Sequence, residues 1–96
     1  MTSKQRAYLK GLANSLDAVF QVGKMSLTPE LTAAIEDAID KKELIKVSVL
    51  KNCADDPAEI AEMVAGRTKS QVVQVIGNKF VLYKPNRDNP KIILPK

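Results

Sequence analysis

Residues 19–39, VFQVGKMSLTPELTAAIEDAI, place a strand, a loop and a helix in direct succession. Residues 19–22 are short, apolar and β-branched at two positions, which favours a buried strand. Thr28 is a typical helix N-cap, and Pro29 suits the first helical position because the N–H it lacks would have no partner there. Apolar residues then recur at helical spacing through Ile39. The succession predicts a sheet with crossover connections.

The loop between this strand and this helix, Gly23-Lys24-Met25-Ser26, has features of a phosphate site. Gly23 can adopt positive φ and lets a ligand approach the main chain, while Lys24 supplies a positive charge. The following helix N-terminus adds N–H groups and a favourable dipole. One glycine between a strand and a helix is also a routine connection, so the loop taken alone leaves both interpretations open.

Before the loop, the spacing predicts a helix over residues 4–15 with Ser3 as its N-cap. Its expected apolar side consists of Tyr8, Leu9, Leu12, Ala13 and Leu16. Arg6 and Lys10 are four residues apart and therefore share the opposite face, with Lys4 at the helix start. These bases line one surface with the loop if the next strand brings the loop back toward the helix. Otherwise they form an ordinary solvated face.

After residue 39 the pattern continues with a strand over residues 44–50 and a helix that begins at Asp56-Pro57 and ends at Gly66. A strand over residues 72–76 follows, with a tight turn at Gly77-Asn78. The chain then returns antiparallel over residues 80–83.

Phe80 and Tyr83 are expected on opposite faces of that last strand, so one of them is a candidate for stacking on a base. From Pro85 onward the chain is expected to be an extended tail in which residues 92–94 pack back on the body. The element order predicts one compact α-β-α-β-α-β-β domain over residues 1–96, with a four-stranded mixed sheet.

Composition narrows the possible chemistry. The chain has 96 residues, no histidine and a single cysteine, Cys53. An intramolecular disulfide is therefore impossible, and the usual zinc sites and histidine-assisted nucleophiles are excluded. Neighbouring carboxylates such as Asp37 and Asp40 fit a solvated helix face. We expect a protein that is not an enzyme and uses neither a metal nor a cofactor.

Charge is divided unevenly along the chain. Residues 28–62 contain nine acids and four bases, whereas the remainder contains eleven bases and two acids. Such a division favours a molecule with one basic side, and basic sides commonly meet nucleic acid. Arg67 and Lys69 are further candidates for that side. The alternative is that lysines and arginines merely solvate different faces.

No stretch approaches the roughly 20 apolar residues that a membrane-spanning helix needs. The first ten residues interleave Lys4, Arg6 and Lys10 with polar residues, where a signal peptide would place its apolar region. We expect a cytoplasmic protein without a membrane partner.

Several segments together closely resemble the CRM domain (chloroplast RNA splicing and ribosome maturation), in its single-domain bacterial YhbY-like form. They are TSKQRAYL at residues 2–9, VFQVGK at 19–24, ELIKV at 43–47, VQVIG at 73–77 and VLY at 81–83. The resemblance covers nearly the whole chain. It implies a fold similar to the C-terminal domain of translation initiation factor three, and an RNA-binding module that associates with precursors of the large ribosomal subunit.

Family members carry a G-x-x-G loop, resembling that of KH domains, where Gly23-Lys24-Met25-Ser26 stands here, and they bind RNA through it and nearby bases. This chain departs at the last position, because Ser26 replaces the second glycine. The RNA-binding residues we expect are Gly23, Lys24, Met25, Ser26, Lys4, Arg6, Lys10, Arg67 and Lys69.

The leading hypothesis is therefore a monomeric, cytoplasmic RNA-binding protein that assists large-subunit assembly on ribosomal RNA, with ribosomal proteins as further possible partners. A second hypothesis is a protein-interaction module whose acidic middle segment docks a basic ribosomal protein or assembly factor. An enzyme acting on a phosphorylated small molecule is a distant third.

Overall fold

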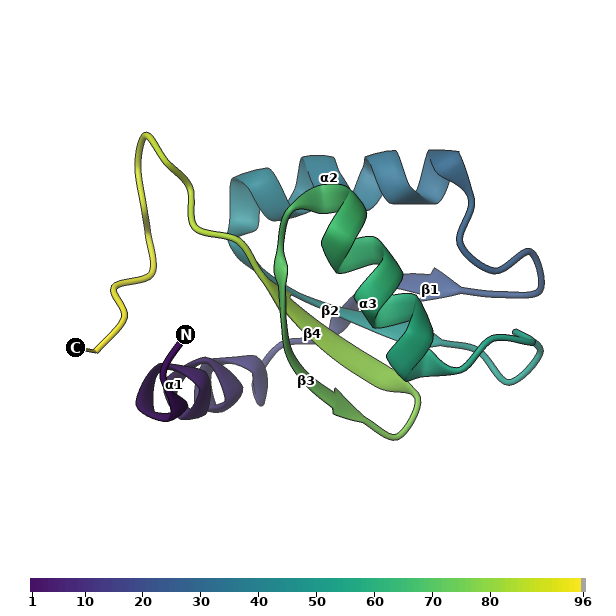
Figure 1. Cartoon of the computed structure of the whole chain (residues 1–96), viewed down its shortest axis with the longest axis horizontal. Helices are drawn as coiled ribbons and strands as arrows, with labels where there is room; N and C mark the ends of the chain where they lie inside the picture. Colours follow the sequence, from purple (N-terminus) through teal and green to yellow (C-terminus); the bar gives the residue numbers. More distant parts are fainter. Residues whose placement is uncertain (96) are drawn as a thin grey trace.

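The computed structural model describes residues 1–95 and has the predicted order of elements (Figure 1). The elements are α1 (Ser3–Ala13), β1 (Ala18–Val22), α2 (Pro29–Lys42), β2 (Leu44–Val49), α3 (Pro57–Thr68), β3 (Gln71–Ile76) and β4 (Lys79–Tyr83).

The four strands form one mixed sheet in the order β1-β2-β4-β3. β1 and β2 are parallel and are joined through α2, whereas β2 pairs with β4, and β4 with β3, in antiparallel fashion. The predicted mixed sheet is confirmed. In sequence order β4 comes last, yet it lies between β2 and β3, so the central pair of strands is β2 and β4.

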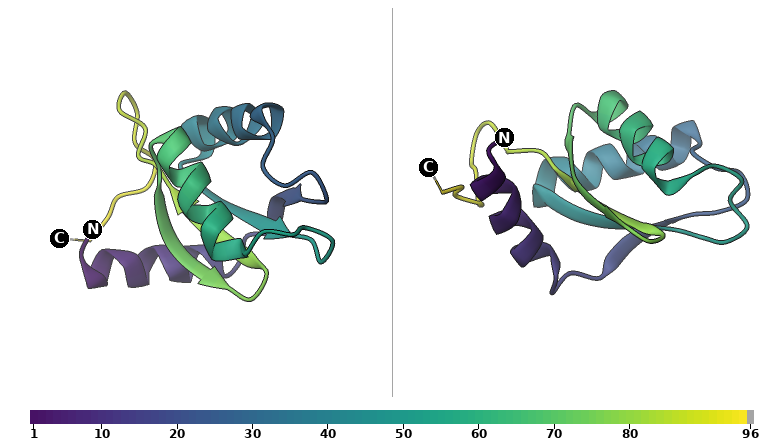
Figure 2. Two further views of the ribbon diagram at one scale, coloured as in Figure 1. Left: turned by 45° about the vertical axis from the view of Figure 1, so that its right-hand side comes forward. Right: turned by 60° about the horizontal axis from the view of Figure 1, so that its bottom comes forward.

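The sheet has helices on both faces (Figures 1 and 2). α2 and α3 cover one face, where the larger core includes Ile35, Ile45, Ile60 and Phe80. α1 covers part of the other face, where Leu9 and Ala13 pack with a smaller cluster completed by Leu44, Val73, Val81 and Tyr83. Alternation along β2 and β4 therefore supplies both cores from the same strands.

Helix α1 begins one residue earlier than predicted. Thr2, not Ser3, is the N-cap: its hydroxyl accepts from the Gln5 N–H at 3.1 Å, and the Gln5 side-chain oxygen accepts from the Thr2 N–H at 3.0 Å. This reciprocal capping box satisfies two amides that the helix cannot. The helix ends at Ala13, and Tyr8, predicted in the core, is 44% exposed. Only the stripe through Leu9 and Ala13 faces the sheet.

Helix α3 runs past Gly66, where the sequence predicts its end, and stops at Thr68. The left-handed residue that ends it is Lys69, with φ of 59°. The Ser70 N–H bonds to the Ala65 carbonyl at 3.0 Å and closes the last turn. At the other end Asp56 is the predicted N-cap, but its side chain makes no capping hydrogen bond.

The predicted Gly77-Asn78 turn is confirmed, with Gly77 at φ of +56°. Asn78 also fastens the turn to β2, because its side chain donates to the Val49 carbonyl at 3.1 Å. Phe80 and Tyr83 do lie on opposite faces. Both are buried, so the expectation that one of them is free to stack on a base is wrong.

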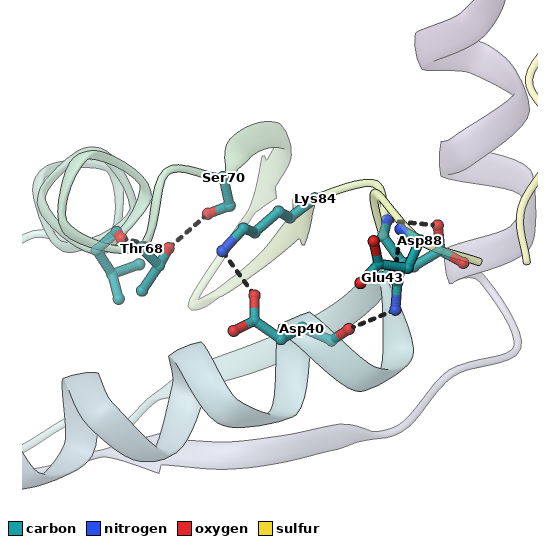
Figure 3. A network of polar contacts seen from close by, with 8 residues as sticks. Asp40, Glu43, Thr68, Ser70, Lys84 and Asp88 are labelled. Carbon is teal, nitrogen blue, oxygen red and sulfur yellow. Dashed lines mark hydrogen bonds and ion pairs between the residues drawn. The ribbon is translucent and has the colours of Figure 1, made fainter. Parts of the chain in front are cut away.

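The tail after β4 is extended and packs back only in part. Ile92 and Leu94 contact the smaller core as predicted, whereas Ile93 is 81% exposed. The tail is held at Glu43, a buried residue between α2 and β2, whose carboxylate accepts from tail N–H groups (Figure 3). In the described residues, 1–95, none of the helices has the length and apolar character needed to cross a membrane.

Candidate nucleic-acid interface

The loop Gly23-Lys24-Met25-Ser26 is a tight turn, because the Ser26 N–H donates to the Gly23 carbonyl at 2.9 Å. The sequence allows positive φ at Gly23, but the residue of this loop that adopts it is Ser26, with φ of 58°. The position that departs from the G-x-x-G pattern of the resemblance is therefore the position that adopts left-handed geometry. For a residue other than glycine this geometry costs roughly 1–2 kcal/mol.

The strained Ser26 has a partner that the sequence does not announce. Its hydroxyl donates to a carboxylate oxygen of Asp55, a residue 29 positions further along the chain. A hydrogen bond to a charged group contributes about 1.5–3 kcal/mol, enough to offset the backbone strain. The bond also joins the loop to the segment between β2 and α3, and it occupies the hydroxyl that would otherwise face a ligand.

Gly23 is not required by the packing of the fold. A methyl group placed on it would lie 3.6 Å from Leu50 Cδ1 and 3.9 Å from Asn52 Oδ1, which are ordinary contacts. With neither positive φ nor crowding at this residue, the structure tolerates a side chain here. What glycine provides is a partly exposed stretch of main chain, with no side chain of its own, next to the exposed Lys24.

The N-terminus of α2 offers fewer amides than expected. Pro29 has none, the Leu31 N–H donates to the Thr28 hydroxyl at 3.1 Å, and the Thr32 N–H donates to the Thr28 carbonyl at 2.9 Å. Within residues 1–95, only the Glu30 N–H of this first turn has no protein acceptor, and Glu30 brings its own negative charge. The exposed Lys24 is thus the main attraction for an anion here.

Arg6 has a structural role at the other end of the molecule. Its guanidinium Nη1 donates to the Val72 and Val73 carbonyls, both at 2.9 Å. These carbonyls lie in β3 where its pairing with β4 shifts by one residue, at a bulge between Val72 and Gln74. Arg6 is half-buried and clamps α1 to this irregular edge, whereas Lys4 and Lys10 are exposed.

The predicted bases do not converge on a single surface. α1 lies with the chain termini at one end of the molecule, and the loop after β1 lies at the opposite end of a body that measures 39 × 26 × 21 Å (Figures 1 and 2). Of the two arrangements that the sequence leaves open, the structure has the second: β1 runs away from α1 and does not bring the loop back to it (Figure 1). Arg67 and Lys69 form a third location at the C-terminus of α3.

Lys69 lines an open polar hollow together with Asp40, Lys84, Asn86 and Asp88. Asp40 pairs with Lys84 at 2.6 Å there, as Figure 3 shows. This hollow mixes charges of both signs, so it is a poorer anion site than an unopposed lysine. No group of three potential metal ligands occurs within residues 1–95.

Two further lysines lie on the sheet itself. Lys46 belongs to β2 and Lys79 to β4, and the register places both on the face that α1 covers in part. In the sequence Lys46 stands between the apolar residues Ile45 and Val47, and this alternation favours a Lys46 side chain that faces away from the larger core. The strand order, which places β4 beside β2, could not be obtained from the sequence, and it is this order that brings the two lysines together.

Comparison with known proteins places the chain in one family, and two relatives of similar length carry similar names. The family described as CRS1 / YhbY (CRM) domain matches residues 1–84. A Bacillus subtilis protein named "Probable RNA-binding protein YqeI" is 43% identical over 95 residues, covering 99% of both chains. A Haemophilus influenzae protein named "RNA-binding protein" is 38% identical over 96 residues, covering 100% of this chain and 96% of the other.

Among solved structures, the solution structure of SAV1595 from Staphylococcus aureus matches this fold with a TM-score of 0.83. The two sequences are 42% identical, and the match covers 99% of each chain.

Proposed function

The chain belongs to the CRS1 / YhbY (CRM) domain family, and we propose on this basis that it binds RNA. We propose that its target is ribosomal RNA in precursors of the large ribosomal subunit, and that it acts there without enzymatic activity. Relatives that match it end to end are named RNA-binding proteins. The observation that carries the proposal is this family membership. The net charge of the chain, +4, is consistent with it. Polynucleotide is the partner that such a charge favours. We further propose that it acts in the cytoplasm as a monomer.

At the loop, we assign phosphate contact to Lys24 and to the main chain of Gly23. Support comes from the exposure of Lys24 and from the partly exposed main chain of Gly23, which has no side chain of its own. Met25 is 79% exposed, which supports an apolar contact between its side chain and a sugar or base. Ser26 acts indirectly, since its hydroxyl holds the turn against Asp55.

At the other end, Lys4 and Lys10 are the exposed cations of α1, and we assign phosphate contacts to them as well. Arg6 has donors left after its two carbonyl bonds but is fixed in place by them. Arg67 and Lys69 have the smaller part, because they lie beside the mixed charges of the hollow near Asp40.

The variant Gly23→Ala tests the loop assignment, because it separates folding from binding. The structure accepts the methyl group, so the free energy of unfolding should change by less than about 1 kcal/mol. RNA affinity should nevertheless fall if phosphate approaches this main chain. Lys24→Gln should weaken binding of oligoribonucleotides of different sequence to a similar degree, since phosphate contacts carry no base information.

Fluorescence anisotropy with labelled RNA measures both variants, and Lys42→Gln on α2 serves as a control of equal charge. If Gly23→Ala and Lys24→Gln bind RNA as tightly as the control, the loop is not the site.

The second candidate function is docking of a basic protein, favoured by the exposed acids on α2 and α3. Glu36, Asp37, Asp40, Glu59 and Glu62 all lie on this helical layer and are exposed. Recovery of partners from lysate before and after ribonuclease treatment separates the two functions. Partners that remain bound after RNA is digested support protein docking, whereas partners lost with the RNA support the first proposal.

A further inference from the structure

The fold separates the charges of the chain by layer. α1 and the four strands contain no acidic residue, although they contribute Lys4, Arg6, Lys10, Lys46 and Lys79. The acids are confined to α2, α3 and the connecting segments and tail. The side of the molecule formed by α1 and the sheet is therefore basic, and the helical layer on the opposite side is acidic.

α1 covers only one end of its side of the sheet. Its buried residues pack with Leu44 at the start of β2 and with Tyr83 at the end of β4. The other end of this face, toward the Gly77-Asn78 turn, is open, as the right-hand view of Figure 2 shows. We call it the open half of the sheet, and it comprises Gln21, Lys46, Gln74, Ile76 and Lys79, which are exposed or half-buried, around the buried Ser48.

Cross-strand register orders these side chains into two rows. One row runs Gln21, Ser48, Lys79 and Ile76 across β1, β2, β4 and β3. In the next row Lys46 and Gln74 flank Val81 on either side. Lys46 and Lys79 are therefore diagonal neighbours on adjacent antiparallel strands, at a Cα spacing of about 7–8 Å.

Neither lysine is neutralised by the protein. The ion pairs found within residues 1–95 are Lys41 with Asp37 and Lys84 with Asp40, both outside this face. Lys46 is half-buried beside Val81, so its alkyl stem lies on apolar surface while its ammonium reaches solvent. Two unopposed cations on a rigid sheet favour a polyanion.

The open half of the sheet also lies between the two other proposed RNA contacts, the loop that carries Lys24 and the helix α1. β1 and β2 are parallel, and both end beside the loop that carries Lys24. At its opposite margin the open half meets α1, which carries Lys10. A polymer that follows this side of the molecule from Lys24 to Lys10 would pass over the open half, where Lys79 and Lys46 lie.

We propose that the open half of the sheet is a second RNA-contact surface, across which single-stranded RNA passes between the loop of Lys24 and helix α1. Lys46 and Lys79 bind its phosphates, and the amides of Gln21 and Gln74 donate to and accept from base edges. Ile76, 59% exposed, supplies an apolar contact for a base. The inference rests on the proposed RNA-binding function and extends it to residues outside the loop and α1.

Single-stranded RNA suits this surface because its bases can turn toward the protein. No aromatic side chain lies on the open half to provide strong stacking, and the lysines recognise phosphate only. The glutamine amides each carry both a donor and an acceptor, so they can pair with the edges of more than one base. Contact here is thus expected to tolerate many sequences and to depend on salt.

The test compares three double variants of the full chain by fluorescence anisotropy, with a labelled oligouridylate and a labelled random-sequence RNA pool over a series of KCl concentrations. In K46Q/K79Q the affinity should fall, and the slope of log K against log salt should become shallower by about 1.4, for two phosphates at about 0.7 each. K46R/K79R keeps both charges and should retain the slope. K41Q/K42Q removes the same charge from the acidic layer and should also retain it.

Amide chemical shifts of the unmutated protein provide a second measurement that does not depend on variant folding. Added oligouridylate should shift the amides of Gln21, Lys46 and Lys79 and leave those of α2 in place.

Each outcome is decisive. Loop amides that shift while those of the open half do not, or a K46Q/K79Q slope equal to that of K41Q/K42Q, would overturn this inference and leave the proposed function standing. An unmutated protein that binds neither RNA would overturn both. Shifts of the open half with polyglutamate but not with RNA would assign the surface to an acidic protein instead.

Discussion

Glu43 is the residue on which the end of the chain depends. It is fully buried, has φ of 67°, and its carboxylate accepts hydrogen bonds from the N–H groups of Asn86 at 3.0 Å, of Lys91, and of Ile92 at 3.2 Å. Its main-chain carbonyl accepts from the Lys84 N–H at 2.8 Å. A carboxylate that receives three donors is well satisfied although it is buried, so it serves as a fixed anchor for the tail.

The variant Glu43→Gln should lower the free energy of unfolding by about 1–3 kcal/mol, because the amide NH2 of glutamine faces N–H donors where a carboxylate oxygen accepted them. Urea unfolding followed by circular dichroism measures the change. Asp40→Asn is the matched control, since it removes the same charge from an exposed pair with Lys84 and should cost less than about 1 kcal/mol. Equal losses in the two variants would contradict the anchoring role.

Tyr83 makes the stability sensitive to alkaline pH. Burial, and secondly the charge of Glu43, raise the pKa of its hydroxyl above the ordinary value of 10.0. The unfolded chain therefore releases this proton at lower pH than the folded chain does. The stabilisation is present below about pH 10 and is lost as the pH rises through the folded pKa.

Tyr83→Phe should remove this part of the pH dependence. Unfolding free energies of the two proteins, measured at a series of alkaline pH values, should decline more steeply for the unmutated chain. Parallel curves would show that Tyr83 does not titrate differently in the two states.

At the scale of single elements, α1 and α3 each contain a glycine that serves no packing purpose. A methyl group on Gly11 or Gly66 would meet nothing within 4 Å. Gly11→Ala and Gly66→Ala should therefore each stabilise the protein by about 0.5–1 kcal/mol, through the lower backbone entropy of the unfolded chain. Thermal melts of the single and double variants measure this gain. Gly77→Ala is the opposite control, because φ of +56° makes it destabilising.

The sequence predicts the elements well because their signals are local. Thr28 and Pro29 begin α2 as expected, and Gly77-Asn78 forms the hairpin. Errors arise where a tertiary contact outweighs a local signal. α3 continues through Gly66 because Ala65 and Thr68, on either side of that glycine, are buried against the body of the protein. Tyr8 has core spacing, yet the sheet covers a narrower stripe of α1 than the periodicity suggests.

The candidate site is less predictable than the fold, since its parts are distant in sequence. Nothing local links Ser26 to Asp55, and nothing in the spacing of Arg6 indicates that it binds the carbonyls of Val72 and Val73. The loop motif and the α1 lysines are visible in the sequence. Their separation to opposite ends follows from the direction of β1, and the grouping of Lys46 with Lys79 follows from the order of the strands.

At the scale of the whole molecule, the uneven charge of the sequence becomes two opposed surfaces. The acidic segment folds into α2 and α3, and the basic remainder forms α1 and most of the sheet. A polyanion approaching this dipole is oriented before contact, with its phosphates toward the sheet. If RNA binds the basic side, as proposed, the acidic layer is left free for a basic partner, so the two candidate functions would use different faces and would not exclude each other.

The salt dependence of RNA affinity tests this layered arrangement as a whole. If about three to five phosphates of single-stranded RNA are neutralised, log K should fall against log salt with a slope of about −2 to −3.5. The double variant Glu36→Gln with Asp37→Asn removes two acids from α2, on the side opposite to α1. It should raise the RNA affinity at low salt but leave the slope of log K against log salt unchanged. These residues contact no phosphate, and their field is screened over about 8–10 Å. Anisotropy titrations at several KCl concentrations measure both quantities. A slope near zero, or one that changes when these acids are removed, would mean that RNA is held by something other than the basic side of the sheet.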